Sequence, residues 1–244
     1  MRRQLRSELV KLRSTRTNLG LLVGMVGLVL MIVIVSSVAV EPSELAKADH
    51  QRAIFGLGLA GGFIGALIGV MSITSELRHG TIRPTFVFTP KRDRVIVAKV
   101  LSSLALGALF GAVTEALAFG TGLAIVALRG VDVALSTQAL LLIALGSVAA
   151  AALMAALGVG FGAVARNQVL AVIGVVVWFM LVENIVVSAW PSVGRFFPLA
   201  AGDALTGIDA KELLTAPQGG LVLVGYVLAL CAAGLAVTRR RDVT

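Results

Sequence analysis

Charged residues are scarce in this sequence. They make up 14% of its 244 residues, whereas hydrophobic residues make up 58%, and the mean hydropathy is +0.98. In a soluble globular domain, about a quarter of the residues are charged. The composition therefore excludes a sizeable soluble domain and predicts an integral membrane protein.

Aromatic residues and cysteine are scarce as well. The net charge of +8 would suit a nucleic-acid-binding protein, because basic groups neutralise phosphates and aromatic rings stack on bases. Only 5% of the residues are aromatic, however, so we expect no nucleic-acid partner. The single cysteine, Cys231, excludes a disulfide framework and a cysteine-based metal cluster.

Motifs of membrane-associated enzymes are missing. No Gly-Lys pair occurs, so the phosphate-binding pattern G-x-x-x-x-G-K-[ST] is absent, and so is H-E-x-x-H. The two histidines, His50 and His79, fall in loops on opposite sides of the predicted membrane, which does not suit an intramembrane serine protease. We expect a chain that is not an enzyme, with no catalytic residue, no metal site and no cofactor of its own.

Long apolar stretches dominate what is present. Crossing a bilayer core takes about 20 apolar residues of helix, and six stretches meet this requirement. All six prolines fall outside them, where the missing N–H breaks no helical hydrogen bond. The predicted spans are residues 19–40, 53–74, 101–128, 139–164, 169–190 and 219–237.

Basic residues are distributed unevenly between the connections. Sixteen of the 21 Lys and Arg lie in the N-terminal segment, in residues 75–99, at Arg166 and at the C-terminus. Because positive residues stay on the cytoplasmic side, we expect a multi-pass protein of the cell membrane with both termini cytoplasmic. The domains are then a cytoplasmic segment 1–18, a six-span domain 19–237 and a cytoplasmic tail 238–244.

The N-terminal segment has a narrow apolar stripe. Leu5, Leu9 and Leu12 are spaced as on one face of a helix, with basic residues around them. Such an amphipathic helix lies in the headgroup layer against anionic lipid. It serves either as a positive-inside anchor or as a lever joined to the first span.

The connection between the second and third spans, residues 75–99, holds eight formal charges and two prolines. Gly80 is suited to ending the second helix, because glycine readily takes the left-handed conformation found there. Thr89 and Pro90 have the pattern of an N-cap and a first helical position. The apolar residues between these signals require burial, either in lipid headgroups or in the groove of a partner protein.

These residues carry a family resemblance. Glu76, the run Gly80-Thr81-Ile82-Arg83, Thr89-Pro90, Arg92, Arg94 and Lys99 resemble the second-to-third-helix loop of ABC-2 type transporter permeases, in particular short bacterial six-span ones. The N-terminal run "SELVKLRSTRTN" and the six-span layout are similar as well, so the resemblance covers essentially the whole chain. Pro84 departs from it, which leaves the extent of a coupling helix after Arg83 open.

The resemblance implies a permease subunit of an ATP-binding cassette exporter, with the N-terminal helix as a connecting helix. It also implies a separate ATPase that binds ATP and Mg²⁺ and docks on loop 75–99, and a homodimer or heterodimer that moves substrate by alternating access. The residues expected to couple to the ATPase are Glu76, Arg78, Gly80, Thr81, Ile82, Arg83, Phe86, Pro90, Arg92 and Lys99.

Two acidic residues lie inside predicted spans. Glu115 is near the middle of the third span, and Glu183 is in the outer half of the fifth, beside Asn184. Acids within a membrane usually face the bundle interior or an aqueous cavity, so these three residues are candidates for a substrate path. The structural alternative is a hydrogen bond to a neighbour, with Thr114 and Asn184 as possible partners.

Two further alternatives stay open. Gly61, Gly65 and Gly69 recur every four residues, which allows close helix contact either within the bundle or between two chains. The alternative function is an ATP-independent protein, either a secondary transporter with Glu115 as proton carrier or a membrane assembly factor.

Overall fold

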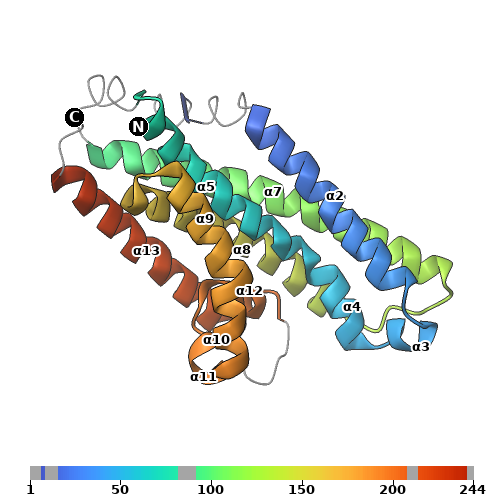
Figure 1. Cartoon of the computed structure of the whole chain (residues 1–244). Helices are drawn as coiled ribbons and strands as arrows, with labels where there is room; N and C mark the ends of the chain where they lie inside the picture. Colours follow the sequence, from blue (N-terminus) through green and yellow to red (C-terminus); the bar gives the residue numbers. More distant parts are fainter. Residues whose placement is uncertain (1–6, 9–15, 82–91, 208–213, 241–244) are drawn as a thin grey trace.

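The computed structural model describes residues 7–8, 16–81, 92–207 and 214–240 (Figure 1). In these ranges the regular structure is entirely helical, which confirms the predicted all-α fold. In chain order the elements are α2 (Arg16–Val38), α3 (Pro42–Leu45), α4 (Ala48–Phe55), the 3₁₀ turn η1 (Gly56–Leu59), α5 (Ala60–Arg78), α7 (Arg92–Leu128), α8 (Thr137–Ala165), α9 (Gln168–Val177), the π-helical η2 (Trp178–Val182), α10 (Glu183–Ala189), α11 (Pro191–Gly194), α12 (Pro198–Leu205) and α13 (Ala216–Arg240).

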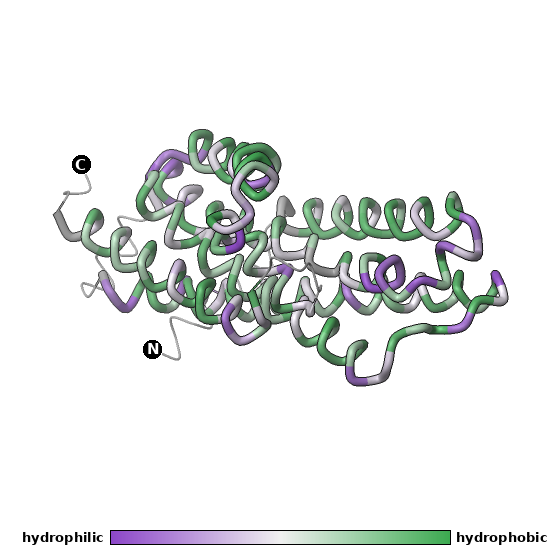
Figure 2. Tube along the Cα trace, turned by 90° about the horizontal axis from the view of Figure 1, so that it is seen from below, coloured by the Kyte–Doolittle hydropathy of each residue, from purple (hydrophilic) through white to green (hydrophobic). Residues whose placement is uncertain are grey.

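Six helical runs in the described ranges are long and apolar enough to cross a membrane, as predicted. Figure 2 shows hydrophobic residues along the long helices and hydrophilic ones mainly near their ends. The third run, Asp93–Leu128, has 36 residues. At 1.5 Å per residue it is about 54 Å long and exceeds a bilayer core of about 30 Å. This helix must therefore tilt or extend beyond the membrane.

The second span is longer than its apolar stretch predicts. It runs through α4, η1 and α5, from Ala48 to Arg78, because the polar residues of α4 are also helical. Gln51 in α4 is fully buried. Its amide donates to Asp132 O at 2.9 Å and accepts from Ala134 N at 2.8 Å. These bonds fix α4 to the connection that follows α7.

Helix α8 lies at the centre of the bundle and contacts α5, α7, α9, α12 and α13. Small residues let its backbone approach α5. A Cβ on Gly69 would lie 2.0 Å from Ala155 O, and one on Gly158 would lie 2.0 Å from Ala66 O. Gly61 and Gly65 also face α7 or α8. The glycine stripe therefore packs within the bundle, the first of the two alternatives.

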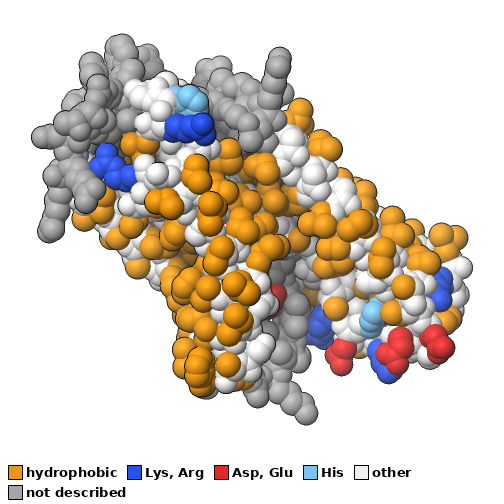
Figure 3. Space-filling model, in the orientation of Figure 1, with side chains coloured by type: hydrophobic (Ala, Val, Ile, Leu, Met, Phe, Trp, Pro, Cys, Tyr) orange, Lys and Arg blue, Asp and Glu red, His pale blue; other side chains and the backbone are white. Residues whose placement is uncertain are grey.

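The polar parts of the molecule gather at the two ends of the bundle. On the face in Figure 3, hydrophobic side chains cover the middle, and most charged side chains lie toward the ends. The start of α2, the end of α5, the start of α7 and the end of α13 lie at one end (Figure 1). We call this the charged-loop end. At the opposite end, Arg129 joins α7 to the end of α2 by donating to Ser37 O at 2.7 Å and Val40 O at 2.6 Å.

Short helices separate the fifth and sixth spans. Helices α11 and α12 begin with Pro191 and Pro198, a position where the missing N–H costs nothing. Helix α12 packs against α13 and α8. Pro217 lies in the first turn of α13, because this helix begins earlier than its apolar stretch does. Proline fits there for the same reason.

Candidate functional site

The end of α5 forms as its glycine predicts. The helix ends at Arg78, and Gly80 takes a left-handed conformation with φ of 69°. His79 N donates to Ser75 O at 2.9 Å, and Gly80 N donates to Leu77 O at 3.4 Å. These bonds satisfy carbonyl groups that the helix end leaves without partners. The helix therefore ends at Arg78, followed by a left-handed turn at Gly80.

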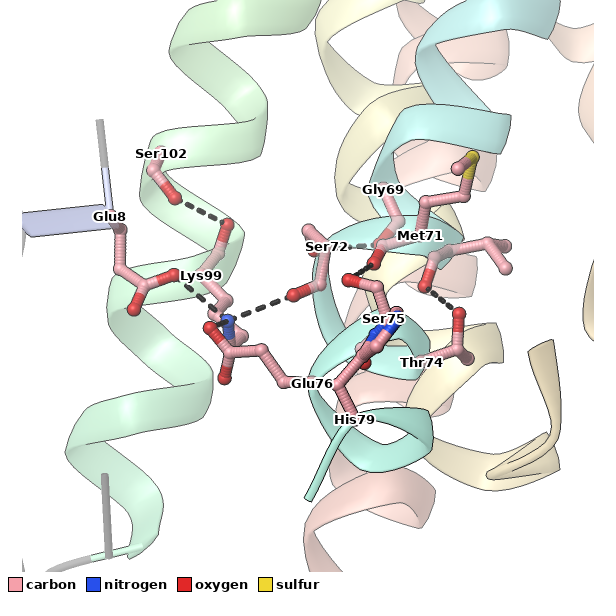
Figure 4. Close-up of polar contacts among 11 residues, drawn as sticks. Glu8, Gly69, Met71, Ser72, Thr74, Ser75, Glu76, His79, Lys99 and Ser102 are labelled. Atoms are coloured by element: carbon pink, nitrogen blue, oxygen red, sulfur yellow. Dashed lines mark hydrogen bonds and ion pairs between the residues drawn. The ribbon is translucent and has the colours of Figure 1, made fainter. Parts of the chain in front are cut away.

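Lys99 lies about two helical turns after the start of α7 at Arg92. Its ammonium group contacts oxygen atoms from other parts of the chain (Figure 4). Its Nζ lies 2.8 Å from Glu8 Oε2, 3.0 Å from Glu76 Oε1 and 2.9 Å from Ser72 O. Glu8 comes from the N-terminal segment, whereas Ser72 and Glu76 lie one turn apart on α5. We call Glu8, Ser72, Glu76 and Lys99 the Lys99 cluster.

The cluster is almost closed to solvent. The side chains of Lys99, Glu8 and Glu76 are 1%, 4% and 10% exposed. An ion pair in such a place is costly to break, because the remaining charge is left buried. Glu76 and Lys99 are both among the residues expected to couple to the ATPase, whereas Glu8 is not, since no local periodicity relates residue 8 to residue 99.

The other predicted coupling residues lie around this cluster or beyond the described chain. Arg78 is exposed, and its Nη1 lies 3.4 Å from Gln168 Oε1 of α9. Thr81 is exposed at the end of the described run. Ile82, Arg83, Phe86, Pro90 and the departure Pro84 lie outside the described residues, and so does the side chain of Arg92.

The predicted N-terminal amphipathic helix also falls largely outside the described residues. Of segment 1–18, the structure describes Ser7 and Glu8, both helical, and the start of α2. Its role as a connecting helix therefore stays a prediction. The contact between Glu8 and Lys99 is the described link between this segment and the bundle.

Glu115 is buried where α7 meets α8. Its side chain is 4% exposed, and Gly111, one turn earlier, would place a Cβ 2.7 Å from Ala151 Cβ of α8. The Ser147 hydroxyl is a neighbouring polar group, but neither Glu115 oxygen reaches hydrogen-bond geometry in the described chain. The Thr114 hydroxyl, its suggested partner, lies 2.8 Å from Phe110 O in its own helix.

Glu183 is 1% exposed and contacts the start of α12. Its Oε1 accepts from Leu199 N at 2.5 Å and from Ala200 N at 3.0 Å. These are N–H groups that the first turn of a helix leaves without partners, and a negative charge is favourable at that end. The N-cap residue Phe197 has no capping side chain. Glu183 therefore caps α12 from a neighbouring element.

Asn184 occupies a different environment from its neighbour. It is exposed, and its Nδ2 donates to Phe179 O at 2.8 Å and to Met180 O at 3.3 Å. Both carbonyl groups belong to the π-helical turn η2, where the regular hydrogen-bond pattern shifts. Asn184 thus stabilises this turn. The structural alternative, a hydrogen bond between Glu183 and Asn184, is not formed among the described residues.

Asp203 is a further acid that the sequence did not single out. It lies in α12, where burial raises its pKa from 3.8 to about 7. Arg52 of α4 donates to the Gly207 carbonyl just after α12. Asp203 lies in the connection between the predicted spans 169–190 and 219–237. The run "PLAAGDAL", with a proline start and mostly apolar residues, is a weak signal for a buried helix there.

Six helices long and apolar enough to span a membrane, with a buried ion-pair cluster at the charged-loop end, define a polytopic membrane protein in the described ranges. A family model described as "ABC-2 family transporter protein" matches residues 21–195, which include nearly all of the first span, the next four spans and the charged connection. The chain therefore belongs to the ABC-2 transporter family, as its loop motif indicated. Comparison with curated proteins gives no significant match.

Proposed function

We propose that the chain is the permease subunit of an ATP-binding cassette exporter, powered by a separate ATPase at the charged-loop end. Family membership supports a permease in general. The observation that carries the finer proposal is the Lys99 cluster, which joins the end of α5 to the first turns of α7, the two helices on either side of the charged connection. A force on this connection reaches α5 and α7 together.

In this proposal the ATPase binds ATP and Mg²⁺ and docks on the loop at Arg78, Thr81 and the residues that follow. Two permease chains, identical or related, surround the substrate path in the cell membrane. Closure of the ATPases tilts α5 and α7, and the cavity opens alternately to the two sides of the membrane. The substrate class stays open between hydrophobic drugs, lipids and peptides.

The test is co-purification of the chain with an ATPase encoded beside it. The proposal expects a stable complex that weakens when Arg83 and Phe86 are replaced by alanine. Glu44→Ala, at the opposite end, serves as the control. Equal recovery of the ATPase with wild type and with the loop variant contradicts the docking role of the loop.

The rival function, an ATP-independent transporter with Glu115 as proton carrier, gives a different result. Proteoliposomes that contain the chain alone would then take up or release protons when a pH gradient is imposed, and Glu115→Gln would abolish this flux. Glu115 is buried in the contact of α7 with α8, and we expect no flux above that of empty liposomes.

A further inference from the structure

The Lys99 ammonium contacts three oxygens within the cluster. Lysine has three N–H donors and no acceptor, and three oxygens lie within 3.0 Å of Nζ. Two of these acceptors come from α5 and the third from Glu8 (Figure 4). The N-terminal segment is therefore needed to complete the bonding of a lysine that lies in another element.

Because Lys99 and Glu8 are both buried, the loss of their contact costs free energy. Lys99 is 1% exposed with Glu8 in place, so removing the Glu8 carboxylate leaves a buried ammonium with one acceptor fewer. A buried charged group that loses a partner is costly, and the cost falls on any motion that separates residue 8 from α7. The contact resists such separation, whereas an exposed pair such as Glu44–Lys47 does not.

The Lys99 cluster lies at the end of α5 and in the first turns of α7. Lys99 lies close to the start of α7, and Glu76 lies close to the end of α5, so the cluster sits at the base of the predicted ATPase-docking loop. Glu8 lies shortly before α2, which begins at Arg16. Along the chain, α2 leads to α3 at the opposite end of the bundle (Figure 1).

We propose that Glu8 is a positioning residue for coupling: its ion pair with Lys99 makes residue 8 move with the ends of α5 and α7, so that one push on the loop also reaches the first span. This inference rests on the proposed function, because it assumes that the loop receives the motion of an ATPase. The loop by itself connects only α5 and α7, whereas the ion pair of Glu8 would pass the motion to α2 as well.

The first experiment needs no ATPase. Spin labels are placed at two exposed positions, Ser7→Cys and Val97→Cys, after Cys231→Ser, and the chain is put into nanodiscs. We expect one narrow distance distribution in the wild-type background and also with the control Glu44→Ala. With Glu8→Ala the distribution should broaden, and with Glu8→Gln, which keeps an acceptor oxygen, it should broaden less. An unchanged distribution with Glu8→Ala overturns the inference.

The second experiment uses the complex with the ATPase, trapped with ATP, Mg²⁺ and vanadate. Labels at Ser43→Cys and Val193→Cys report on the opposite end of the bundle. We expect trapping to shift their distance in the wild-type background. With Glu8→Ala the shifted population should fall to less than about a fifth, while the ATPase still co-purifies.

The outcomes separate the two proposals. If trapping gives no shift in the wild-type background, the proposed function fails, and the coupling role of Glu8 fails with it. If trapping shifts the labels equally with and without the Glu8 carboxylate, the proposed function stands and the inference about Glu8 is wrong.

Discussion

At the scale of single residues, Lys99 is a buried cation held by two carboxylates and a backbone carbonyl. It is 1% exposed and contacts the carboxylates of Glu8 and Glu76. Lys99→Met leaves both carboxylates buried without this cation, so we expect a loss of stability of about 3 to 5 kcal/mol. Unfolding in detergent, followed by circular dichroism, measures the change.

The control for Lys99 is Lys47, whose pair with Glu44 is exposed. Replacing Lys47 by methionine should change stability by less than about 1 kcal/mol. Equal effects of the two replacements would mean that the Lys99 cluster is no more important for stability than a surface pair.

Asp203 predicts a dependence of stability on pH. Burial raises its pKa from 3.8 to about 7, so between these values the folded chain holds a proton that the unfolded chain releases. Stability therefore falls as pH rises from about 4 to 7, and it stays lower above pH 7. Asp203→Asn removes this loss and should stabilise the protein at pH 8, by up to about 4 kcal/mol, but not at pH 4.

Unfolding midpoints at several pH values between 4 and 8 measure this effect. The exposed Asp49 gives the matched variant, Asp49→Asn, which should leave the pH profile of the wild type intact. A profile of Asp203→Asn that runs parallel to the wild type at all pH values contradicts the assigned cause.

At the scale of elements, helix α12 depends on Glu183. Glu183→Ala removes the acceptor of Leu199 N and Ala200 N, and unsatisfied buried donors cost about 1 to 3 kcal/mol each. We expect faster hydrogen exchange in α12, whereas Glu183→Gln, which keeps an acceptor oxygen, should preserve most of the protection. Unchanged exchange in the alanine variant would leave the substrate-path role as the better explanation of this acid.

The contact of α5 with α8 gives a second prediction for elements. Gly69→Ala would place a Cβ 2.0 Å from Ala155 O, so the helices must move apart, at a cost of about 1 to 3 kcal/mol. Gly24→Ala on α2 has nothing within 4 Å of the new Cβ and should be neutral or stabilising by up to about 1 kcal/mol. Thermal unfolding of both variants tests the difference, which disappears if the glycine stripe has no packing role.

These elements also show what sequence can predict. The six spans followed from the length of the apolar stretches, and the end of α5 followed from Gly80, because both are local signals. The cap of α12 joins Glu183 to Leu199, which are 16 positions apart in the sequence. The contact of Glu8 with Lys99 joins residues that are 91 positions apart. Such contacts depend on how helices pack, which no local periodicity encodes. Residues 82–91 lie outside the described chain, so their predicted roles stay predictions.

At the scale of the whole molecule, the uneven distribution of basic residues predicts the orientation of the bundle. Because Lys and Arg near the spans stay on the cytoplasmic side, the charged-loop end should face the cytoplasm and α3 the exterior. Labelling of single cysteines tests this in a Cys231→Ser background. His79→Cys and Ser43→Cys are exposed positions at the two ends.

With a maleimide that does not cross membranes, intact cells should label Ser43→Cys and leave His79→Cys unreacted until the membrane is permeabilised. This orientation is a requirement of the proposed function, because an ATPase docks only on a loop that faces cytoplasmic ATP. Labelling of His79→Cys in intact cells would place the Lys99 cluster on the exterior. The ion pair would then remain a structural feature of the fold, and the cytoplasmic ATPase could not dock on the loop.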